Sequence, residues 1–159
     1  MGCDIHITAE IATANGYEPI RNIAFAEGSA PFDWRSYGMF GFLADVRNYS
    51  AVTPIAEPRG LPNDLSAEIR DEYEGWGSDA HTASWISISE LTAFDFNQKM
   101  EDRRVTQQTS DRTWDGGCTA KQGDGATTTY KDFLGQSFIN DLKKLQECGA
   151  DRVVFWFDC

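Results

Sequence analysis

The sequence has no apolar run approaching the roughly 18 residues of a membrane-spanning helix, so we expect no span and no membrane partner. It also has no Cys-x-x-Cys pair, no phosphate-binding loop or dinucleotide fingerprint, and no Gly-x-Ser-x-Gly nucleophile motif. The chain starts MGCDIHITAE, with acids where a signal peptide needs a basic end and an apolar segment. These absences predict a cytoplasmic protein without a common nucleotide site or catalytic triad.

Basic side chains are scarce, with 14 Lys and Arg against 25 Asp and Glu, for a net charge of −11. Nonspecific nucleic-acid binding depends on Lys and Arg that neutralise phosphates, so we do not expect it here. The negative charge fits simple solubility. It also fits a protein that presents acidic groups to a basic partner.

The four cysteines are Cys3, Cys118, Cys148 and Cys159, which allow three pairings. No other feature of the sequence indicates an oxidising compartment, where structural disulfides are common. We therefore predict free thiols.

The length of 159 residues predicts a single α/β domain with its own hydrophobic core, to which ten Phe and five Trp contribute. Residues 101–129 differ from the rest, because Val105 and Trp114 are the only large apolar residues among polar ones. Such a segment buries little, and we predict an insertion or lid that moves relative to the core.

Two segments have strong strand patterns. Residues 3–11 alternate between apolar and polar side chains, and Asn15 and Gly16 give a hairpin signal before a returning strand at 17–20. Residues 152–158 are apolar on both faces, which is typical of an interior strand. We predict a mixed sheet in which the first and last strands are neighbours.

Helical spacing of apolar residues predicts helices over 36–47, 65–76 and 131–147. Ser87 and Glu90 have the spacing of a capping box and predict the start of a short helix. We expect these helices to pack on the sheet.

Both histidines of the chain follow an aspartate after one aliphatic residue: Asp4 precedes His6, and Asp79 precedes His81. On the first strand, Asp4 and His6 share the polar face with Cα atoms roughly 6.5–7 Å apart, so both can reach one ion or substrate atom. The second pair falls in a predicted loop at 77–82.

If the terminal strands are neighbours, Asp158 joins this group. Asp4, His6, His81 and Asp158 then make a nitrogen and oxygen ligand set that suits a divalent zinc, manganese or iron ion. His6, His81 and Asp79 are the candidate catalytic acids and bases, with or without a metal. The alternative is structural: His6 is hydrogen-bonded on a half-covered sheet face, and His81 caps a turn that Asp79 begins.

A second group consists of Arg35, Arg47, Asn48 and Arg59, in or beside the first predicted helix. Arginines that cluster in an acidic chain predict a pocket for a small anionic ligand with a phosphate or carboxylate group. The alternative is that they pair with the surplus of acids.

Several blocks resemble a family of short, uncharacterised proteins encoded in tailed-phage genomes and prophages: MGCDIH, FGFLADVRN, EPRGLPNDLS, DAHTASW and VVFWFD. The resemblance covers most of the chain outside 101–129. It implies a phage-encoded accessory protein that acts in the cytoplasm of the bacterial host, and it implies no mechanism.

Two functional hypotheses follow. The first is a metal-dependent or hydrolase-like domain built on the Asp/His pairs. The second is a non-enzymatic inhibitor that binds a host protein, such as a defence protein, or sequesters a small molecule. The sequence leaves the oligomeric state open.

Overall fold

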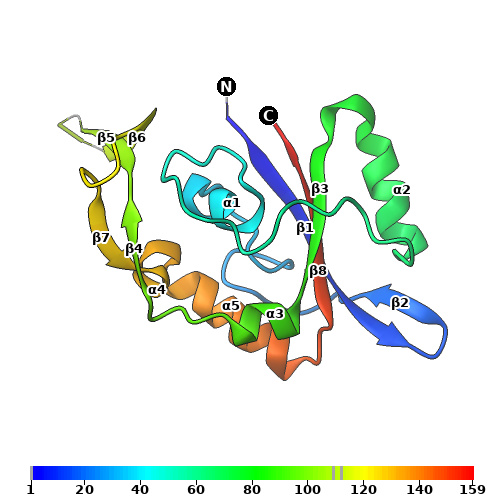
Figure 1. Ribbon diagram of the computed structural model, residues 1–159. Coiled ribbons are helices and arrows are strands. Elements are labelled where there is room, and N and C mark those ends of the chain that lie inside the picture. The colour runs from blue at the N-terminus through cyan, green and yellow to red at the C-terminus, as the bar shows by residue number, and fades with distance from the viewer. Residues whose placement is uncertain (1, 109, 112) are drawn as a thin grey trace. The chain divides into compact units, whose positions relative to one another are not determined.

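A four-stranded sheet joins strands from both ends of the chain in the computed structural model, which describes residues 2–108, 110–111 and 113–159. Its order is β2 (Gly16–Pro19), β1 (Asp4–Thr13), β8 (Arg152–Asp158) and β3 (His81–Ser87). Figure 1 shows the two chain ends emerging side by side from β1 and β8. All three ladders are antiparallel. The predicted α/β fold, with adjacent terminal strands and helices packed on the sheet, is confirmed.

Period-2 alternation separates the two faces of the β1–β8 ladder. Ile5 pairs with Phe157 and Ile7 with Phe155 on one face, which we call the apolar face. The opposite, mixed face carries the pairs Asp4–Asp158, His6–Trp156, Thr8–Val154 and Glu10–Arg152. The strand β8 lies between β1 and β3, and six of its seven residues are buried, as its apolar sequence predicts.

The mixed face is covered by α2 (Ala67–Trp76). Residues 81–85 of the DAHTASW segment lie in the edge strand β3. From α2 and the residues before it, Ile69 and Leu65 pack with Val154 and Trp156 in one buried cluster. The helix therefore buries the apolar side chains of β8 on the mixed face.

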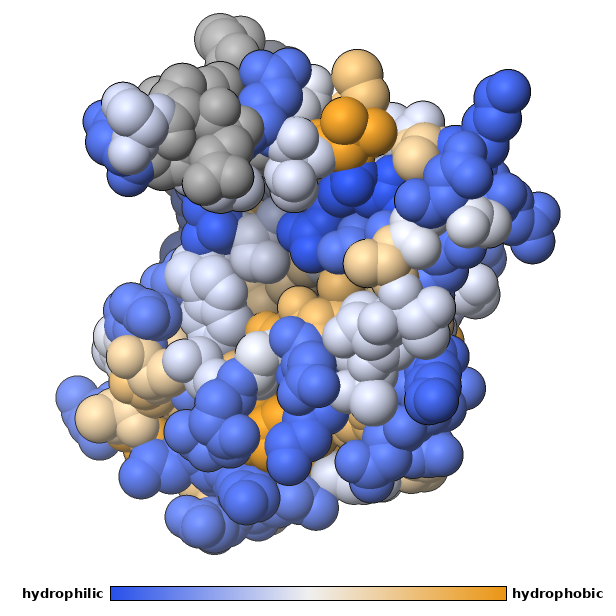
Figure 2. Space-filling view, turned by 90° about the vertical axis from the view of Figure 1, so that its left-hand side faces the viewer, coloured by the Kyte–Doolittle hydropathy of each residue, from blue (hydrophilic) through white to orange (hydrophobic). Residues whose placement is uncertain are grey.

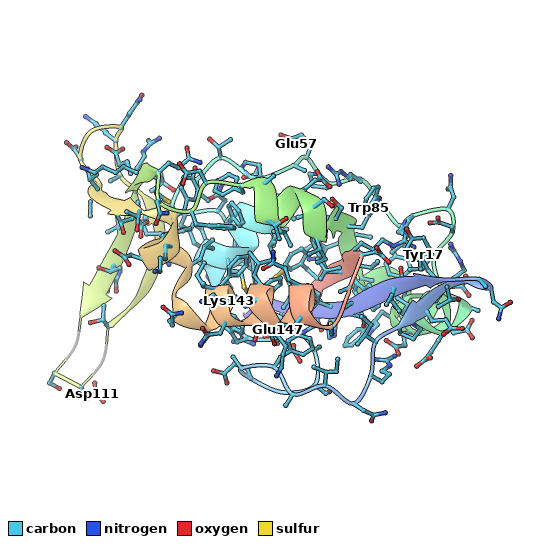
Figure 3. All side chains as sticks on the ribbon, turned by 90° about the horizontal axis from the view of Figure 1, so that it is seen from below. Tyr17, Glu57, Trp85, Asp111, Lys143 and Glu147 are labelled. Carbon is cyan, nitrogen blue, oxygen red and sulfur yellow. A yellow bond between two sulfur atoms is a disulfide. The ribbon has the colours of Figure 1, made fainter. Side chains whose placement is uncertain are left out.

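Two features of the other helices test the sequence predictions: the cap of α3 and a break between α4 and α5. Ser87 and Glu90 form the capping box that begins α3 (Ile88–Ala93). The single helix expected over 131–147 is wrong, because Gly135, at φ 91°, separates α4 (Tyr130–Leu134) from α5 (Gln136–Glu147). Exposed side chains such as Lys143 and Glu147 stand on the outer side of α5 (Figure 3).

Internal contacts divide the chain into two compact units. The first contains the residues up to Arg35, Pro58–Phe94 and Gln136–Cys159, and therefore the whole four-stranded sheet. The second contains Ser36–Glu57 and Asp95–Gly135.

The second unit contains α1 (Tyr37–Ala44), α4 and two small ladders. β4 (Lys99–Asp102) pairs with β7 (Ala126–Thr129), and β5 (Arg104–Gln108) pairs with β6 (Thr113–Thr119). The segment 101–129, predicted as an insertion, is thus largely strand, although Thr109 and Arg112 lie outside the described residues.

The surface is largely hydrophilic on the face shown in Figure 2, with small hydrophobic patches between the polar side chains. In the described part of the chain, no helix combines the length and hydrophobicity needed to cross a bilayer.

Candidate functional site

A cavity of about 390 Å³ opens where β1, β8 and β3 meet at one end of the sheet. Its lining contains most of the Asp and His residues that the sequence singles out. The lining residues are Gly2, Asp4, Trp76, Ser78, Asp79, His81, Asp158 and Cys159. Four of the five Asp and His residues predicted to form a site therefore surround one hollow.

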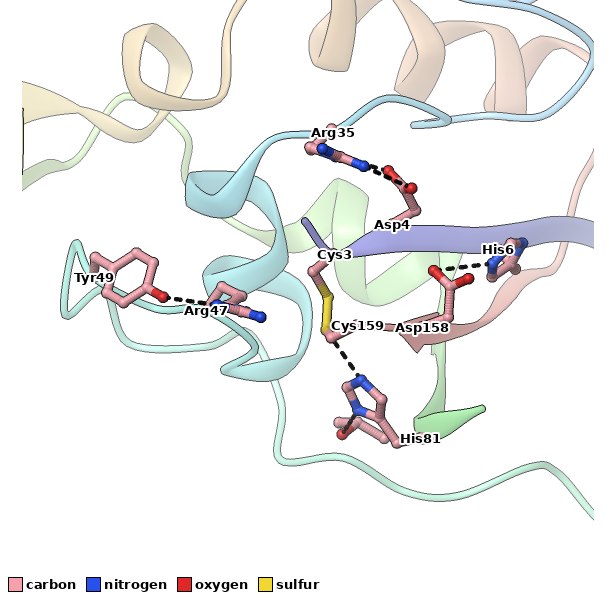
Figure 4. The surroundings of a disulfide bond; sticks show 10 residues. Cys3, Asp4, His6, Arg35, Arg47, Tyr49, His81, Asp158 and Cys159 are labelled. Atoms are coloured by element: carbon pink, nitrogen blue, oxygen red, sulfur yellow. Dashed lines mark hydrogen bonds and ion pairs between the residues drawn. A yellow bond between two sulfur atoms is a disulfide. The ribbon is translucent and has the colours of Figure 1, made fainter. Parts of the chain in front are cut away.

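A disulfide between Cys3 and Cys159 closes one side of this region (Figure 4). The prediction of four free thiols is thus wrong for these two residues, while Cys118 and Cys148 are free. The reason is the β1–β8 register: Asp4 pairs with Asp158, so the residues just outside that pair are cross-strand neighbours, with Cα atoms 4.1 Å apart. That separation is close enough for a disulfide.

His81 contacts this disulfide directly. Its Nε2 lies 3.1 Å from Cys159 Sγ, and its Nδ1 lies 2.9 Å from Thr82 Oγ1. A sulfur in a disulfide has no hydrogen and can only accept, so Nε2 must carry the proton that faces it. In the neutral ring, Nδ1 then accepts from the Thr82 hydroxyl. The two contacts together define one tautomer.

An irregular backbone sets the direction of His81. His81 pairs with Phe157 and Ser84 with Phe155, so β3 has one extra residue between these pairs. Thr82, inside this bulge, has φ 53°, a left-handed conformation that is strained for a β-branched residue and costs about 1–3 kcal/mol. Without the extra residue, His81 would register with Asp158 on the mixed face; the bulge turns it to the face of Phe157.

Among the acids, Asp4 is neutralised locally. Arg35 Nε and Nη2 donate to its two carboxylate oxygens over 2.9 and 2.8 Å. This bidentate hydrogen bond lowers the pKa of Asp4 below its ordinary value. Nearby, burial raises the pKa of the Asp33 carboxyl.

His6 lies on the mixed face, between two tryptophan rings. Its ring centroid is 4.1 Å from that of Trp76 and 6.0 Å from that of Trp156. Its Nε2 is buried and lies 3.5 Å from Asp158 Oδ1, which is too long for a good hydrogen bond. Trp156 Nε1 is also buried, without a hydrogen-bond partner among the described residues.

Within the part of the chain that the structure describes, one group of potential metal ligands lies close enough to share an ion. It consists of Cys3, His81 and Cys159, whose ligand atoms all lie within 4.8 Å of one another. Asp4, His6 and Asp158 are not in this group, because they occupy the mixed face while the bulge turns His81 to the other. The two cysteines are disulfide-bonded here.

The residues of the predicted anion pocket, Arg35, Arg47, Asn48 and Arg59, each bind a different partner within the protein. Arg35 binds Asp4, and Arg59 donates through both terminal nitrogens to Glu90. In the second unit, Arg47 donates to the Tyr49 hydroxyl over 3.2 Å (Figure 4). Asn48 Nδ2 donates to the Asp45 carboxylate and the Val52 carbonyl. Each of the four thus has a local protein partner.

Sequence reasoning missed three residues of this site: Cys3, Cys159 and Thr82. The cysteines carried a signal, since Cys3 begins one predicted strand, Cys159 directly follows the other, and the two strands were predicted to be neighbours. Thr82 carried none, because bulges have no reliable local pattern. The sequence matches no protein-family model, and neither a curated protein nor a solved structure shows a significant match to this chain.

Proposed function

We propose that the cavity is a redox-controlled metal site, in which Cys3, Cys159 and His81 hold a divalent ion once the disulfide is reduced. The observation that supports the proposal is the closeness of the three ligand atoms, within 4.8 Å of one another, beside a cavity with three aspartates. Two thiolates and one imidazole are ligands that zinc prefers.

The distances suit a zinc ion with little movement. Zinc–sulfur and zinc–nitrogen bonds of about 2.3 and 2.0 Å place tetrahedral ligands roughly 3.5–3.8 Å apart. His81 Nε2 is already 3.1 Å from Cys159 Sγ. Reduction has to separate the two sulfurs to van der Waals contact, and His81 has to lose the Nε2 proton.

A site with three protein ligands leaves one position for water or substrate, as in catalytic zinc sites. A bound ion would supply Lewis acidity there. Asp158 and Asp79 line the same cavity and are placed to accept a proton within it. This is the hydrolase-like form of the proposal.

The acidic lining of the cavity indicates the charge of the ligand that it can bind. It is lined by Asp4, Asp79 and Asp158, and Arg35 is paired with Asp4. Carboxylates favour a cation over the small anionic ligand expected from the sequence. We therefore assign the cavity to a cation and its neutral or cationic substrate.

The resemblance to phage proteins leads us to place the protein in the bacterial cytoplasm as an accessory protein. That compartment keeps most thiols reduced. The dithiol form, which can bind a metal, would then prevail, and oxidation would release the ion.

Metal titration of reduced and oxidised protein tests the proposal. A variant with Cys118→Ser and Cys148→Ser would serve as the parent, so that only the site thiols remain. After reduction with a phosphine and removal of oxygen, we expect one Co²⁺ per chain, with the visible absorption of tetrahedral thiolate coordination, and displacement by Zn²⁺. The oxidised parent should bind none.

His81→Ala and Cys159→Ser in this parent should each lose the absorption, and His6→Ala should keep it. Binding should weaken as pH falls, because protons compete for both thiolates and the imidazole. Uptake by the oxidised protein, or equal uptake by His81→Ala, would refute the assignment.

The alternative, an inhibitor that binds a host protein, has less support. Apart from the net negative charge, no feature of the described residues favours it. It predicts that His81→Ala and Cys159→Ser leave partner binding intact.

A further inference from the structure

A second cavity, of about 570 Å³, lies at the other end of the four-stranded sheet, where β3 ends and β8 begins. We infer that this cavity binds a neutral sugar. Its walls come from β2, the loop 59–64, β3 and β8, which all belong to the first unit. It shares no lining residue with the cavity beside the disulfide, so the inference does not rest on the metal proposal. Its volume is typical of small-molecule sites, which measure about 300–1,000 Å³.

Two arginines in the wall of this cavity are held against aromatic rings. The guanidinium of Arg152 lies 3.5 Å from the ring centroid of Tyr17, and that of Arg59 lies 4.7 Å from the ring centroid of Trp85. Both rings line the cavity, at the same end of the sheet (Figure 3). Because a guanidinium covers one face of each ring, these faces are not open to a flat, stacking ligand. The rings instead fix the arginines, whose N–H edges are left to meet a ligand.

The positive charges of both arginines are compensated within the protein. Arg152 is 5% exposed, and it donates to Glu10 through Nε over 2.7 Å and to Asp64 through Nη1 over 2.8 Å. Arg59 donates to both carboxylate oxygens of Glu90. A phosphate or carboxylate ligand would have to compete with these acids, so the cavity does not favour an anion.

The lining as a whole carries no net charge, because Arg59 and Arg152 stand against Asp64 and Asp151. It nevertheless keeps hydrogen-bonding capacity. A guanidinium has five N–H donors, and a carboxylate can accept about four hydrogen bonds. Asp151, for example, accepts from the backbone N–H of Ala12 through one oxygen. Donors and acceptors side by side without net charge suit hydroxyl groups, since each hydroxyl both donates and accepts.

The loop 59–64 adds a neutral polar group and an apolar surface. Asn63 is exposed, and its side chain has no partner among the residues that the structure describes. Leu61 and Pro62 line the same cavity and can pack against the C–H groups of a sugar ring. Apolar contacts combined with a few placed polar groups are typical of small-molecule sites. A molecule with several neighbouring hydroxyls and an apolar ring face meets both requirements.

An NMR titration of the isotopically labelled full chain tests the inference, with backbone amides and tryptophan indole N–H groups as reporters. The probes are glucose, galactose, mannose and N-acetylglucosamine. We expect at least one of them to shift the Trp85 indole signal and the amides of 59–64, with a dissociation constant in the millimolar range. The phosphate ester and the amino sugar related to that probe should bind no more tightly, because the lining offers no net charge to either.

Two variants of the cavity wall should weaken binding of the sugar. Arg59→Lys keeps the charge but loses the planar fork, and Asn63→Ala removes an exposed amide. Each should raise the dissociation constant by roughly tenfold, the loss expected for one or two hydrogen bonds. Asn140→Ala is the matched control, because Asn140 is also exposed but lies on α5, outside the lining of this cavity. It should bind the sugar like the natural chain.

Three results would overturn the inference. The first is the absence of shifts at Trp85 and 59–64 with all four sugars. The second is tighter binding of the phosphate ester or the amino sugar, which would make the cavity an anion or a cation site. The third is an equal loss of affinity in Asn140→Ala and Asn63→Ala, which would place the sugar elsewhere. None of these results bears on cobalt binding by Cys3, His81 and Cys159.

Discussion

Breaking the Cys3–Cys159 disulfide should lower the free energy of unfolding by about 5 kcal/mol at 25 °C. The bond joins residues 156 positions apart, so it closes a loop that spans nearly the whole chain. The loss of chain entropy in the unfolded state grows with the logarithm of loop length and gives about this value for such a loop. In a chain of this size the melting temperature should fall by roughly 10–20 °C.

The assay is urea unfolding of the Cys118→Ser/Cys148→Ser parent with and without a phosphine reductant. Reduction is preferable to Cys3→Ser, since that change adds a hydroxyl at a fully buried position and an unrelated cost of about 1–3 kcal/mol. Cys159→Ser, at the exposed end, is the second route to the same state. Because the unfolded chain without the cross-link is more extended, the free energy of unfolding should also fall more steeply with urea concentration.

A loss below about 1 kcal/mol would refute this reasoning. It would mean that the unfolded chain already holds residues 3 and 159 together. Agreement between the reduced parent and Cys159→Ser is the internal control, because both lack the cross-link and differ only in whether residue 159 carries a sulfur or an oxygen atom.

Four further outcomes are expected. Phe155→Ala should cost about 3–5 kcal/mol in urea unfolding, because it empties a fully buried ring site in the interior strand; a cost near 1 kcal/mol would contradict this packing. Thr82→Gly should stay within about 1 kcal/mol of the parent, since relief of left-handed strain offsets the greater freedom of unfolded glycine, yet lose cobalt affinity. The hydrogen bond from Arg59 lowers the pKa of Glu90 from 4.5 to about 2, so the stabilisation by this pair is complete above pH 4.5 and is lost as pH falls towards 2. Glu90→Gln should therefore reduce the pH dependence of the free energy of unfolding in this range, by under about 1 kcal/mol because the Glu90 side chain is 37% exposed. Limited proteolysis should cut within 101–129 before any strand of the four-stranded sheet, and equal protection would make that segment part of a rigid core.

The sheet was predictable because its signals are local. Alternation over 3–11 assigned residues 4–11 of β1 to a face, and the doubly apolar run over 152–158 required an interior position. Ser87 and Glu90 likewise define a helix start within four residues. Patterns of this kind need no knowledge of distant contacts.

The pairing of His81 with its partners was not predictable, for a physical reason. One inserted residue reverses which face a strand side chain occupies, and the pattern HTASWIS contains nothing that marks the insertion. A regular strand would have brought His81 to Asp158, as the ligand set inferred from the sequence assumes. The bulge brings it instead to Cys159, so the spacing identified relevant residues but not which of them meet.

The buried pair Glu10 and Arg152 shows a second limit. Alternation places Glu10 on a polar face, yet it is fully buried and lies 2.7 Å from the guanidinium of Arg152 on the neighbouring strand. Hydrophobic periodicity cannot distinguish a solvated acid from one whose charge is paired inside.

The position of β8 between β1 and β3 has a consequence for biosynthesis. Neither β1 nor β3 has its main ladder partner until residues 152–158 have been made, although the hairpin of β1 and β2 can form early. At a translation rate of about 5–20 residues per second, the edge of β1 that pairs with β8 stays unpaired for roughly 7–30 s. During this interval two strand edges are open to other chains, so aggregation of nascent protein should depend more on translation speed than on the stability of the finished fold.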